Sequence, residues 1–216
     1  MKCDKKHMLL YAVTDKTWLG EETLAIQVEE ALKGGATCIQ LREKEITIEA
    51  LLQEAFAIKD LCKKYNIPFI INDYIDIAIK CGADGIHIGQ HDMNAFLARK
   101  KIGKHMILGI SVQTLEQAEL AQKCGADYLG VGAVFSTSTK LDADYVSYDT
   151  LKEICNAVSI PVVAIGGIHK HNILKLSGTG VDGVALVSAI FASKHIENKC
   201  KELKSLTEQM VARQPY

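Results

Sequence analysis

Charged side chains lie close to the ends of several short apolar runs in this 216-residue sequence. Arg42, Lys44 and Lys140 are cations that could hold a diphosphate, and Asp73 and Asp92 are carboxylates that could hold a metal ion. Mg²⁺ prefers hard oxygen ligands, takes one or two carboxylates, and completes its octahedron with water and substrate phosphate. We therefore expect a diphosphate that the cations bind and that Mg²⁺ bridges to Asp73 and Asp92. A salt-bridge network among the same residues is the alternative.

Glycines and hydroxyl groups indicate a second anion site. Gly166-Gly167 and Val187-Ser188 each follow an apolar run, and the second pair precedes the last helical pattern. Exposed backbone N–H groups and the positive end of a helix favour a phosphate at such a place. The alternative is that the glycines only allow a tight turn. Hydroxyl donors that could reach the same phosphate come from Thr137, Ser138 and Thr139.

Two anion sites imply two phosphorylated small-molecule substrates. Diphosphate is a good leaving group once cations neutralise its charge. The residues therefore predict the transfer of an alkyl group from a diphosphate to a nucleophile on the other substrate. They give a reaction type and leave both substrates open.

Short apolar runs alternate with helical patterns along the whole chain. The runs are apolar on both faces, as is typical of strands that are covered on both sides, and the segments between them have apolar residues at three- and four-residue spacing. Eight such units predict an α/β fold, a single-domain (β/α)8 barrel over residues 1–216 with 194–212 as the final helix; an open doubly wound sheet is the rival. The expected strands are Leu9–Thr14, Thr37–Arg42, Phe69–Asn72, Gly85–Gly89, Met106–Ser111, Tyr128–Gly132, Pro161–Gly166 and Gly183–Val187, and the clearest helical patterns are Glu22–Lys33, Glu49–Tyr65, Leu115–Lys123 and Tyr148–Val158.

A weak internal repeat supports the barrel. It consists of glycine, a small residue and Thr or Asp before the second, fourth, sixth and eighth expected strands. We expect the glycine to end each helix in the left-handed conformation. In a barrel, the loops after the strands form the active face, so the charged and hydroxyl residues above would meet at one mouth. The repeats are Gly34–Thr37, Cys81–Asp84, Cys124–Asp127 and Gly178–Asp182.

Composition excludes several other classes of protein. Lys and Arg total 25 against 26 Asp and Glu, so the chain has no field of one sign for a polyanion, and we expect no nucleic-acid partner. The apolar stretches are too short to span a bilayer, and the N-terminus lacks the apolar core of a signal peptide, so we expect no membrane partner and a cytoplasmic location. The sequence leaves a homo-oligomer open.

Histidine and cysteine offer two less favoured chemistries. His87 and His91 flank Asp92, which leaves a transition-metal site as an alternative to Mg²⁺. The seven cysteines are scattered and contain no C-x-x-C pair, so we interpret them as small buried hydrophobes of a reducing compartment.

The motifs together resemble the thiamine-phosphate synthase family. They occur in order along nearly the whole chain, and QLREK, the ND pair with a second Asp nineteen residues on, and T-x-T-K are the specific ones. The matching segments are Tyr11–Asp15, Gln40–Lys44, Ile71–Tyr74, Ala83–Asp92, Gly109–Ser111, Asp127–Lys140, Ala164–Ile168 and Val184–Ile190.

This resemblance implies that 4-amino-2-methyl-5-hydroxymethylpyrimidine diphosphate is coupled to a thiazole phosphate, which gives thiamine monophosphate and diphosphate. Asp73 and Asp92 would hold Mg²⁺, and Arg42, Lys44 and Lys140 would stabilise the departing charge. The pyrimidine diphosphate would be bound by Gln40, Leu41, Arg42, Glu43, Lys44, Asn72, Ser111 and Lys140, and the thiazole phosphate by Thr137, Ser138, Thr139, Gly167, Val187 and Ser188.

Three positions depart from the family pattern. The family usually has Pro at positions 133 and 136, where this chain has Ala133 and Ser136, and often has His where Gln113 stands. Loss of the prolines would make the loop before Lys140 costlier to order. The related thiazole tautomerases need a base near position 113, so Gln113 favours the synthase. A tautomerase and a non-catalytic phosphate-binding regulatory barrel are the alternative functions.

Overall fold

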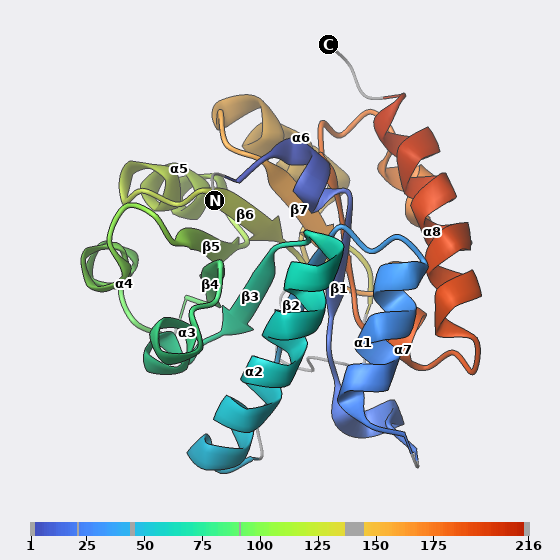
Figure 1. The fold of residues 1–216 in the computed structure, drawn as a ribbon. Coiled ribbons are helices and arrows are strands. Elements are labelled where there is room, and N and C mark those ends of the chain that lie inside the picture. Colours follow the sequence, from blue (N-terminus) through green and yellow to red (C-terminus); the bar gives the residue numbers. More distant parts are fainter. Residues whose placement is uncertain (1–2, 21, 44–45, 91, 137–144, 214–216) are drawn as a thin grey trace.

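The chain folds into a closed barrel of parallel strands. The structure is a computed structural model that describes residues 3–20, 22–43, 46–90, 92–136 and 145–213. Each strand pairs with the next along the chain, and β8 pairs with β1, which closes the sheet and excludes the open doubly wound alternative (Figure 1). The (β/α)8 barrel predicted from the sequence is confirmed. Its strands are β1 (Leu10–Val13), β2 (Cys38–Leu41), β3 (Phe69–Asn72), β4 (Gly85–Ile88), β5 (Ile107–Val112), β6 (Tyr128–Val131), β7 (Val162–Ile165) and β8 (Gly183–Leu186).

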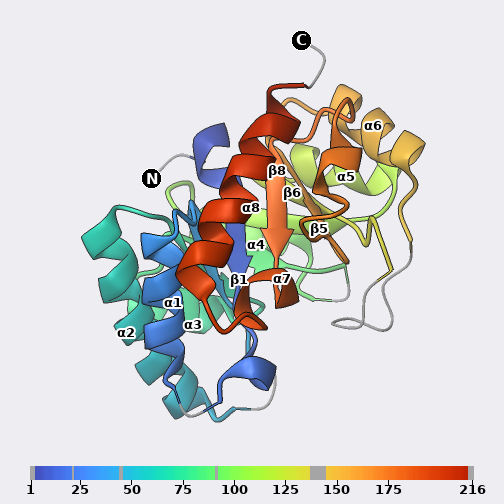
Figure 2. The ribbon, with the colours of Figure 1, turned by 90° about the vertical axis from the view of Figure 1, so that its right-hand side faces the viewer.

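Helices surround the barrel, and α8 lies across β1 and β8 beside α1 (Figure 2). Five of the helices begin at a residue whose side chain accepts a backbone N–H of the first turn. These residues are Thr23, Thr47, Asn94, Thr114 and Ser147. None of the helices in the described ranges combines the length and the apolar character needed to cross a membrane. The helices are α1 (Leu24–Lys33), α2 (Ile48–Tyr65), α3 (Ile75–Cys81), α4 (Ala95–Ile102), α5 (Leu115–Lys123), α6 (Tyr148–Ala157), α7 (Ser188–Phe191) and α8 (Ile196–Val211), with 3₁₀ turns η1 (Lys5–Met8), η2 (Lys16–Trp18) and η3 (Ile173–Leu176).

The seventh and eighth units differ from the regular pattern. After β7 the chain forms only the 3₁₀ turn η3, because Ser177 and Gly178 follow it at once and leave no room for further turns. After β8 it forms α7 and then α8. The helix α8 packs on η3, α1 and α7, and it also contacts β1 and β8.

Apolar side chains form two separate layers, one on each side of the sheet. The larger layer lies between the strands and the helices, and the smaller one fills the inside of the barrel. Alternate residues of each strand point to opposite sides, so the inner layer takes every second strand residue. The inner layer contains Met8, Tyr11, Val13, Cys38, Ile70, Ile107, Tyr128, Val163 and Ala185.

The internal repeat forms the same clasp four times at the amino ends of the strands. In each clasp, the residue before an even-numbered strand accepts, through its side chain, a backbone N–H at the start of the preceding strand. Gly35, Gly82, Gly125, Gly178 and Gly180 have positive φ, whereas Gly34, which was predicted to end its helix in the left-handed conformation, ends α1 with a φ of −74°. The donor and acceptor pairs are Leu10 and Thr37 (2.9 Å), Phe69 and Asp84 (3.0 Å), Leu108 and Asp127 (2.8 Å), and Val162 and Asp182 (2.9 Å).

The cysteines occupy buried or half-buried positions. Cys38, Cys62, Cys81 and Cys200 are buried, and burial raises the pKa of the Cys62 thiol to about 12. A thiol with such a pKa stays protonated near neutral pH and is a poor nucleophile. These cysteines are therefore packing residues, as predicted from the sequence.

Candidate active site

Strand register places several of the predicted site residues that the structure describes around one mouth of the barrel. Asn72 at the end of β3 pairs with His87 of β4, and Ser111 of β5 pairs with Gly130 of β6. Gln40 pairs with Ile70, two residues before Asn72. The side chains that follow these strands therefore converge at the carboxyl end of the barrel, where barrel enzymes have their active sites.

Asp73 and Asp92 are brought into contact by the loops after β3 and β4. The Asp73 carboxyl interacts directly with that of Asp92, and Asn72 Nδ2 donates a hydrogen bond to Asp73 Oδ2 (2.6 Å). Asp92 Oδ2 accepts the Gly89 N–H (2.6 Å), which fixes the second carboxyl. Asp73 has a φ of 63°, a left-handed conformation that is uncommon outside glycine and frequent at functional sites.

Arg42 lies close enough to influence this carboxylate pair. Burial and then the neighbouring Asp92 raise the pKa of Asp73 to about 6, while Asn72 and the Arg42 charge act in the opposite direction. The Arg42 backbone N–H donates to the fully buried hydroxyl of Thr14 (3.0 Å), and its guanidinium lies 3.9 Å from Asp15. Arg42 is thus near enough for its charge to act on Asp73, and its role toward a diphosphate stays a prediction. Thr14, which holds its backbone, was missed.

This pair of carboxylates has the chemistry of a magnesium site. The direct contact between two carboxyls is costly without a cation, and Mg²⁺ uses one or two carboxylates together with phosphate and water. Within the described ranges, no group of three or more His, Cys, Asp and Glu side chains could hold a metal ion. Asp73 and Asp92 therefore fit Mg²⁺ only as a site that substrate oxygens and water complete.

His87 makes other contacts than those of a metal ligand. Its Nδ1 lies 2.9 Å from Tyr128 Oη and its Nε2 lies 2.8 Å from Ser111 Oγ. Both ring nitrogens are engaged, so the transition-metal alternative loses this ligand. His91, its proposed companion, lies outside the described residues.

Glu43 is buried beside Arg42 and shares a lysine with Glu54. Lys16 Nζ lies 2.5 Å from Glu54 Oε1 and 3.8 Å from Glu43 Oε2. Among the described residues, Glu43 Oε1 has no hydrogen-bond partner. Burial raises the pKa of Glu43 to about 7; Lys16 and Arg42 oppose this shift, and Glu54 and Asp15 add to it. Glu43 thus forms part of the wall that supports the mouth.

A chain of buried hydrogen bonds crosses the barrel below the mouth. Gln40 Nε2 donates to Tyr11 Oη (2.8 Å), and Tyr11 Oη lies 2.8 Å from Tyr128 Oη. Tyr128 Oη contacts His87, which contacts Ser111. Two residues predicted to bind the pyrimidine diphosphate, Gln40 and Ser111, therefore stand at the two ends of one network.

Two glycines make room for this network. A Cβ atom on Gly109 would overlap the Tyr128 ring, and one on Gly130 would lie 3.2 Å from His87 Cε1. The glycine of the Gly109–Ser111 motif is thus required by packing against Tyr128.

The predicted phosphate site lies where β7 and β8 end side by side. Ile165 pairs with Ala185, so Gly167 and Val187, each two residues further on, follow neighbouring strands. Gly166 and Gly167 have φ values of 99° and 63°. Gly167 packs against the backbone of Phe135 and Ser136, where a Cβ atom would clash. The glycines are therefore needed for close packing, which agrees with the tight-turn interpretation, and the phosphate-binding interpretation stays a prediction.

The chain is similar to known proteins over most of its length. Residues 10–190 match the family described as "Thiamine monophosphate synthase". The chain belongs to the thiamine monophosphate synthase family. It is 50% identical over 194 residues to the thiamine-phosphate synthase of Clostridium tetani, covering 90% of this chain and 93% of the relative. The corresponding protein of Ruminiclostridium cellulolyticum is 51% identical over 194 residues and covers 90% and 92%.

A solved structure gives the same result. The thiamine phosphate pyrophosphorylase of Pyrococcus furiosus superposes with a TM-score of 0.89 at 37% identity, over 96% of this chain and 98% of that one. The family resemblance predicted from the motifs is confirmed.

For some residues predicted for the thiamine monophosphate synthase site, the structure shows no contact that bears on substrate binding. Leu41 is buried in the layer between the strands and the helices. Val187 and Ser188 begin the short helix α7, whose Ile190 and Phe191 N–H groups bond to the Val187 carbonyl. Outside the described residues lie Lys44, Thr137, Ser138, Thr139 and Lys140.

The positions that depart from the family pattern border the mouth. Gln113 donates its backbone N–H to Gln117 Oε1 (2.8 Å) on α5. Ala133 is buried, and its carbonyl accepts the Val146 N–H (2.8 Å). Ser136 is the last described residue before 137–144. The backbone on both sides of this segment is thus tied to the barrel without the usual prolines.

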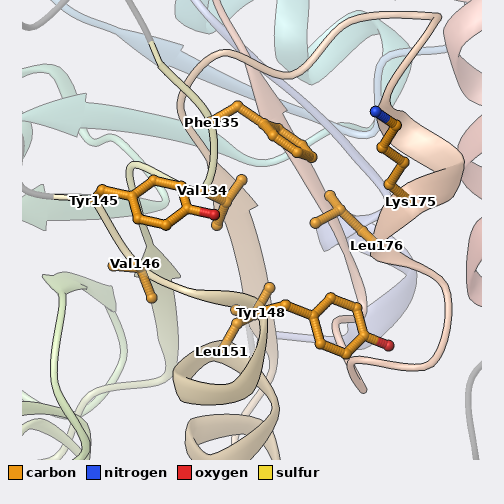
Figure 3. A pocket seen from close by; sticks show the side chains of 8 residues that line it. All are labelled: Val134, Phe135, Tyr145, Val146, Tyr148, Leu151, Lys175 and Leu176. Atoms are coloured by element: carbon orange, nitrogen blue, oxygen red, sulfur yellow. The ribbon is translucent and has the colours of Figure 1, made fainter.

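A cavity of about 90 Å³ lies beside the mouth, between the end of β6, α6 and η3 (Figure 3). Tyr145 stands on one side of it, and Phe135 and Leu176 stand on the other. Its remaining lining residues are Val134, Val146, Tyr148, Leu151 and Lys175. Among the described residues, no predicted site residue lines this cavity.

Proposed function

We propose that this chain joins 4-amino-2-methyl-5-hydroxymethylpyrimidine diphosphate to a thiazole phosphate in thiamine biosynthesis. The products are thiamine monophosphate and diphosphate. The observation that carries the proposal is the contact between Asp73 and Asp92 beside Arg42, in a chain of the thiamine monophosphate synthase family. The synthase name of the relatives favours this transferase over the tautomerase and the regulatory barrel.

The residues of the mouth suit a dissociative transfer. The C–O bond between the pyrimidine methylene and diphosphate breaks, and its electron pair leaves with the diphosphate. The thiazole nitrogen then donates its lone pair to the methylene carbon and forms the new C–N bond. Arg42, Lys44 and Lys140 bind the departing diphosphate and lower the energy of the charge that develops on it. No protein nucleophile is needed.

Asp73 and Asp92 would hold Mg²⁺ at the diphosphate end of the mouth. When bound, this ion supplies positive charge that neutralises the leaving group. Asn72 keeps the Asp73 carboxyl in place through the 2.6 Å hydrogen bond, and Gly89 does the same for Asp92. The two carboxylates are thus oriented before a substrate binds, which reduces the cost of assembling the site.

The second substrate would bind at the ends of β6, β7 and β8. Gly167 and the first N–H groups of the segment at Val187 and Ser188 would hold the thiazole phosphate, together with the hydroxyls of Thr137, Ser138 and Thr139. This arrangement would bring the thiazole to the same mouth as the pyrimidine diphosphate. We infer small phosphorylated molecules as the partners and a cytoplasmic location, where such substrates are made and used.

The experiment that tests the proposal supplies the two substrates separately and together. Purified protein is incubated with the pyrimidine diphosphate, the thiazole phosphate, or both, with Mg²⁺ or with excess chelator, and diphosphate release is measured. We expect release only when both substrates and Mg²⁺ are present. Release without the thiazole phosphate, or no release with all three, would contradict the proposed function.

A further inference from the structure

The loop after β7 is closed by one buried side-chain amide. Asn172 Nδ2 donates a hydrogen bond to the Gly167 carbonyl (2.9 Å), and Asn172 Oδ1 accepts the His169 N–H (2.7 Å). A backbone carbonyl can only accept and a backbone N–H can only donate, so these two partners fix the orientation of the amide. Asn172 is 8% exposed, and in the described part of the chain no other group binds the Gly167 carbonyl. Asn172 therefore holds this carbonyl in place.

The amide holds a stretch of backbone that would otherwise be free to change conformation. Gly166 and Gly167 have φ values of 99° and 63°, and two successive glycines can adopt many conformations besides this one. The two carbonyls before that of Gly167 each accept a backbone N–H from the segment after β6, at 3.0 Å and 3.1 Å. The carbonyl of Gly167 is held by Asn172 instead. Asn172 thus fixes the last of three successive peptide groups.

The fixed carbonyl determines where the next N–H points. The peptide bond between Gly167 and Ile168 is trans, and in a trans peptide the carbonyl and the N–H point in opposite directions. The Ile168 N–H therefore points away from Asn172. Among the residues that the structure describes, neither the Gly167 N–H nor the Ile168 N–H has a hydrogen-bond partner. Successive backbone N–H groups of this kind, in a turn at the end of a strand, can bind an anion together.

We propose that Asn172 is a positioning residue that holds the N–H groups of Gly167 and Ile168 ready for the phosphate of the thiazole substrate. The inference rests on the proposed function for the identity of this substrate. Asn172 acts through the Gly167 carbonyl and does not touch the substrate itself. Its amide supplies both the donor and the acceptor that the loop needs, and it adds no negative charge near a phosphate.

The first test compares Asn172→Ala with the wild type in assays of diphosphate release, in which each substrate is varied while the other is saturating. We expect the KM for the thiazole phosphate to rise about tenfold, because the loop must be ordered when the phosphate binds. The KM for the pyrimidine diphosphate should stay within about twofold of the wild type, since this substrate binds elsewhere in the mouth.

Thr179→Val is the matched control. Thr179 is also fully buried, and its hydroxyl donates to the Leu176 carbonyl (2.7 Å) in the same unit of the barrel. The variant therefore loses a comparable buried hydrogen bond away from Gly167. We expect it to keep the wild-type KM for both substrates.

A second test uses inorganic phosphate and needs no turnover. Phosphate is titrated into the protein at constant ionic strength, and the assigned backbone amide signals are followed by NMR. In the wild type we expect the Gly167 and Ile168 amide signals to shift. In Asn172→Ala, about tenfold more phosphate should be needed for half of the shift.

The outcomes separate the role of Asn172 from the proposed function. The positioning role would be overturned if Asn172→Ala changed neither KM or raised both equally, or if Thr179→Val raised the KM for the thiazole phosphate as much. Absence of a phosphate-dependent shift at Gly167 and Ile168 in the wild type would also overturn it, even if Asn172→Ala failed to fold. A wild type without turnover would contradict the proposed function, and the phosphate titration would then still decide the role of Asn172.

Discussion

Asp73 and Asp92 bring two carboxyl groups into contact from the ends of neighbouring strands, and burial together with Asp92 raises the pKa of Asp73 to about 6. The contact costs stability when no cation is bound, so Asp73→Asn should weaken Mg²⁺ binding and at the same time stabilise the metal-free fold. We expect the Mg²⁺ concentration for half-maximal turnover to rise at least about tenfold. We also expect the metal-free fold to gain about 1 kcal/mol at pH 8, measured by urea unfolding, because one buried charge is removed.

Asp92→Asn should give the same pair of effects. The matched control is Asp76→Asn, because Asp76 pairs with Lys101 on the surface, and it should change neither the Mg²⁺ requirement nor the stability appreciably. An Asp73→Asn variant with an unaltered Mg²⁺ requirement would refute the metal role of this pair.

Lys140→Ala should reduce turnover without unfolding the barrel. Loss of one charge that stabilises the departing diphosphate is expected to lower kcat by about 100-fold. The melting temperature should stay within about 2 °C of the wild type, since the role assigned to Lys140 is to bind the substrate. Lys152→Ala, on the exposed side of α6, is the control for loss of a lysine. Unchanged turnover in Lys140→Ala would rule out its assigned role.

Glu43 should make the stability of the protein fall as pH rises. Burial raises its pKa from 4.5 to about 7, so the folded state holds a proton that the unfolded state has lost between these values. Unfolding free energy therefore decreases from about pH 4.5 to pH 7, and the cost is complete above pH 7.

Glu43→Gln, which cannot ionise, should remove this dependence and be more stable than the wild type at pH 8 by roughly 1–3 kcal/mol. Parallel urea titrations at pH 5 and pH 8 measure the effect. Identical differences between variant and wild type at both pH values would show that Glu43 ionises normally in the folded state.

Much of the fold could be predicted from the sequence because the spacing of apolar residues along the chain follows the pattern of burial. Strands covered on both faces are apolar on both faces, and the glycine repeats end helices with positive φ, as at Gly82 and Gly125. The seventh unit was harder to predict, because η3 has apolar residues at helical spacing but is followed at once by Ser177 and Gly178. The small number of residues before Ser177, rather than the spacing of the apolar residues, decides that this segment forms a 3₁₀ turn.

The site was predicted less completely, because hydrogen-bond partners come from strands that are distant in sequence. The contact between Asp73 and Asp92 follows from barrel topology and was expected. The roles of Tyr11 and Tyr128 were missed, although both stand in apolar strands where a hydroxyl needs a partner. A search for polar groups at inward-facing strand positions would have found both tyrosines together with His87.

The clasp at Asp84 should contribute measurably to stability. Its carboxylate accepts the Phe69 N–H and pairs with Lys59 at 3.1 Å, so Asp84→Ala leaves a strand-end N–H without its partner. We expect a loss of about 1–3 kcal/mol in urea unfolding, and a smaller loss in Asp84→Asn, which keeps an acceptor oxygen. The control is Asp60→Ala on the exposed face of α2. If Asp84→Ala and Asp60→Ala were equally stable, the clasp would carry no energy of its own.

Gly109→Ala should test whether the space for Tyr128 is as tight as the structure shows. The added methyl would overlap the Tyr128 ring, whereas Gly130→Ala would only press on His87 at 3.2 Å. We expect Gly109→Ala to cost about 2–3 kcal/mol of stability and Gly130→Ala clearly less. Combining Gly109→Ala with Tyr128→Leu, which removes the ring, should cost less than the sum of the two single changes by at least about 1 kcal/mol. Strict additivity in this cycle would mean that Gly109 and Tyr128 do not share the space, and Gly109 would then need another explanation.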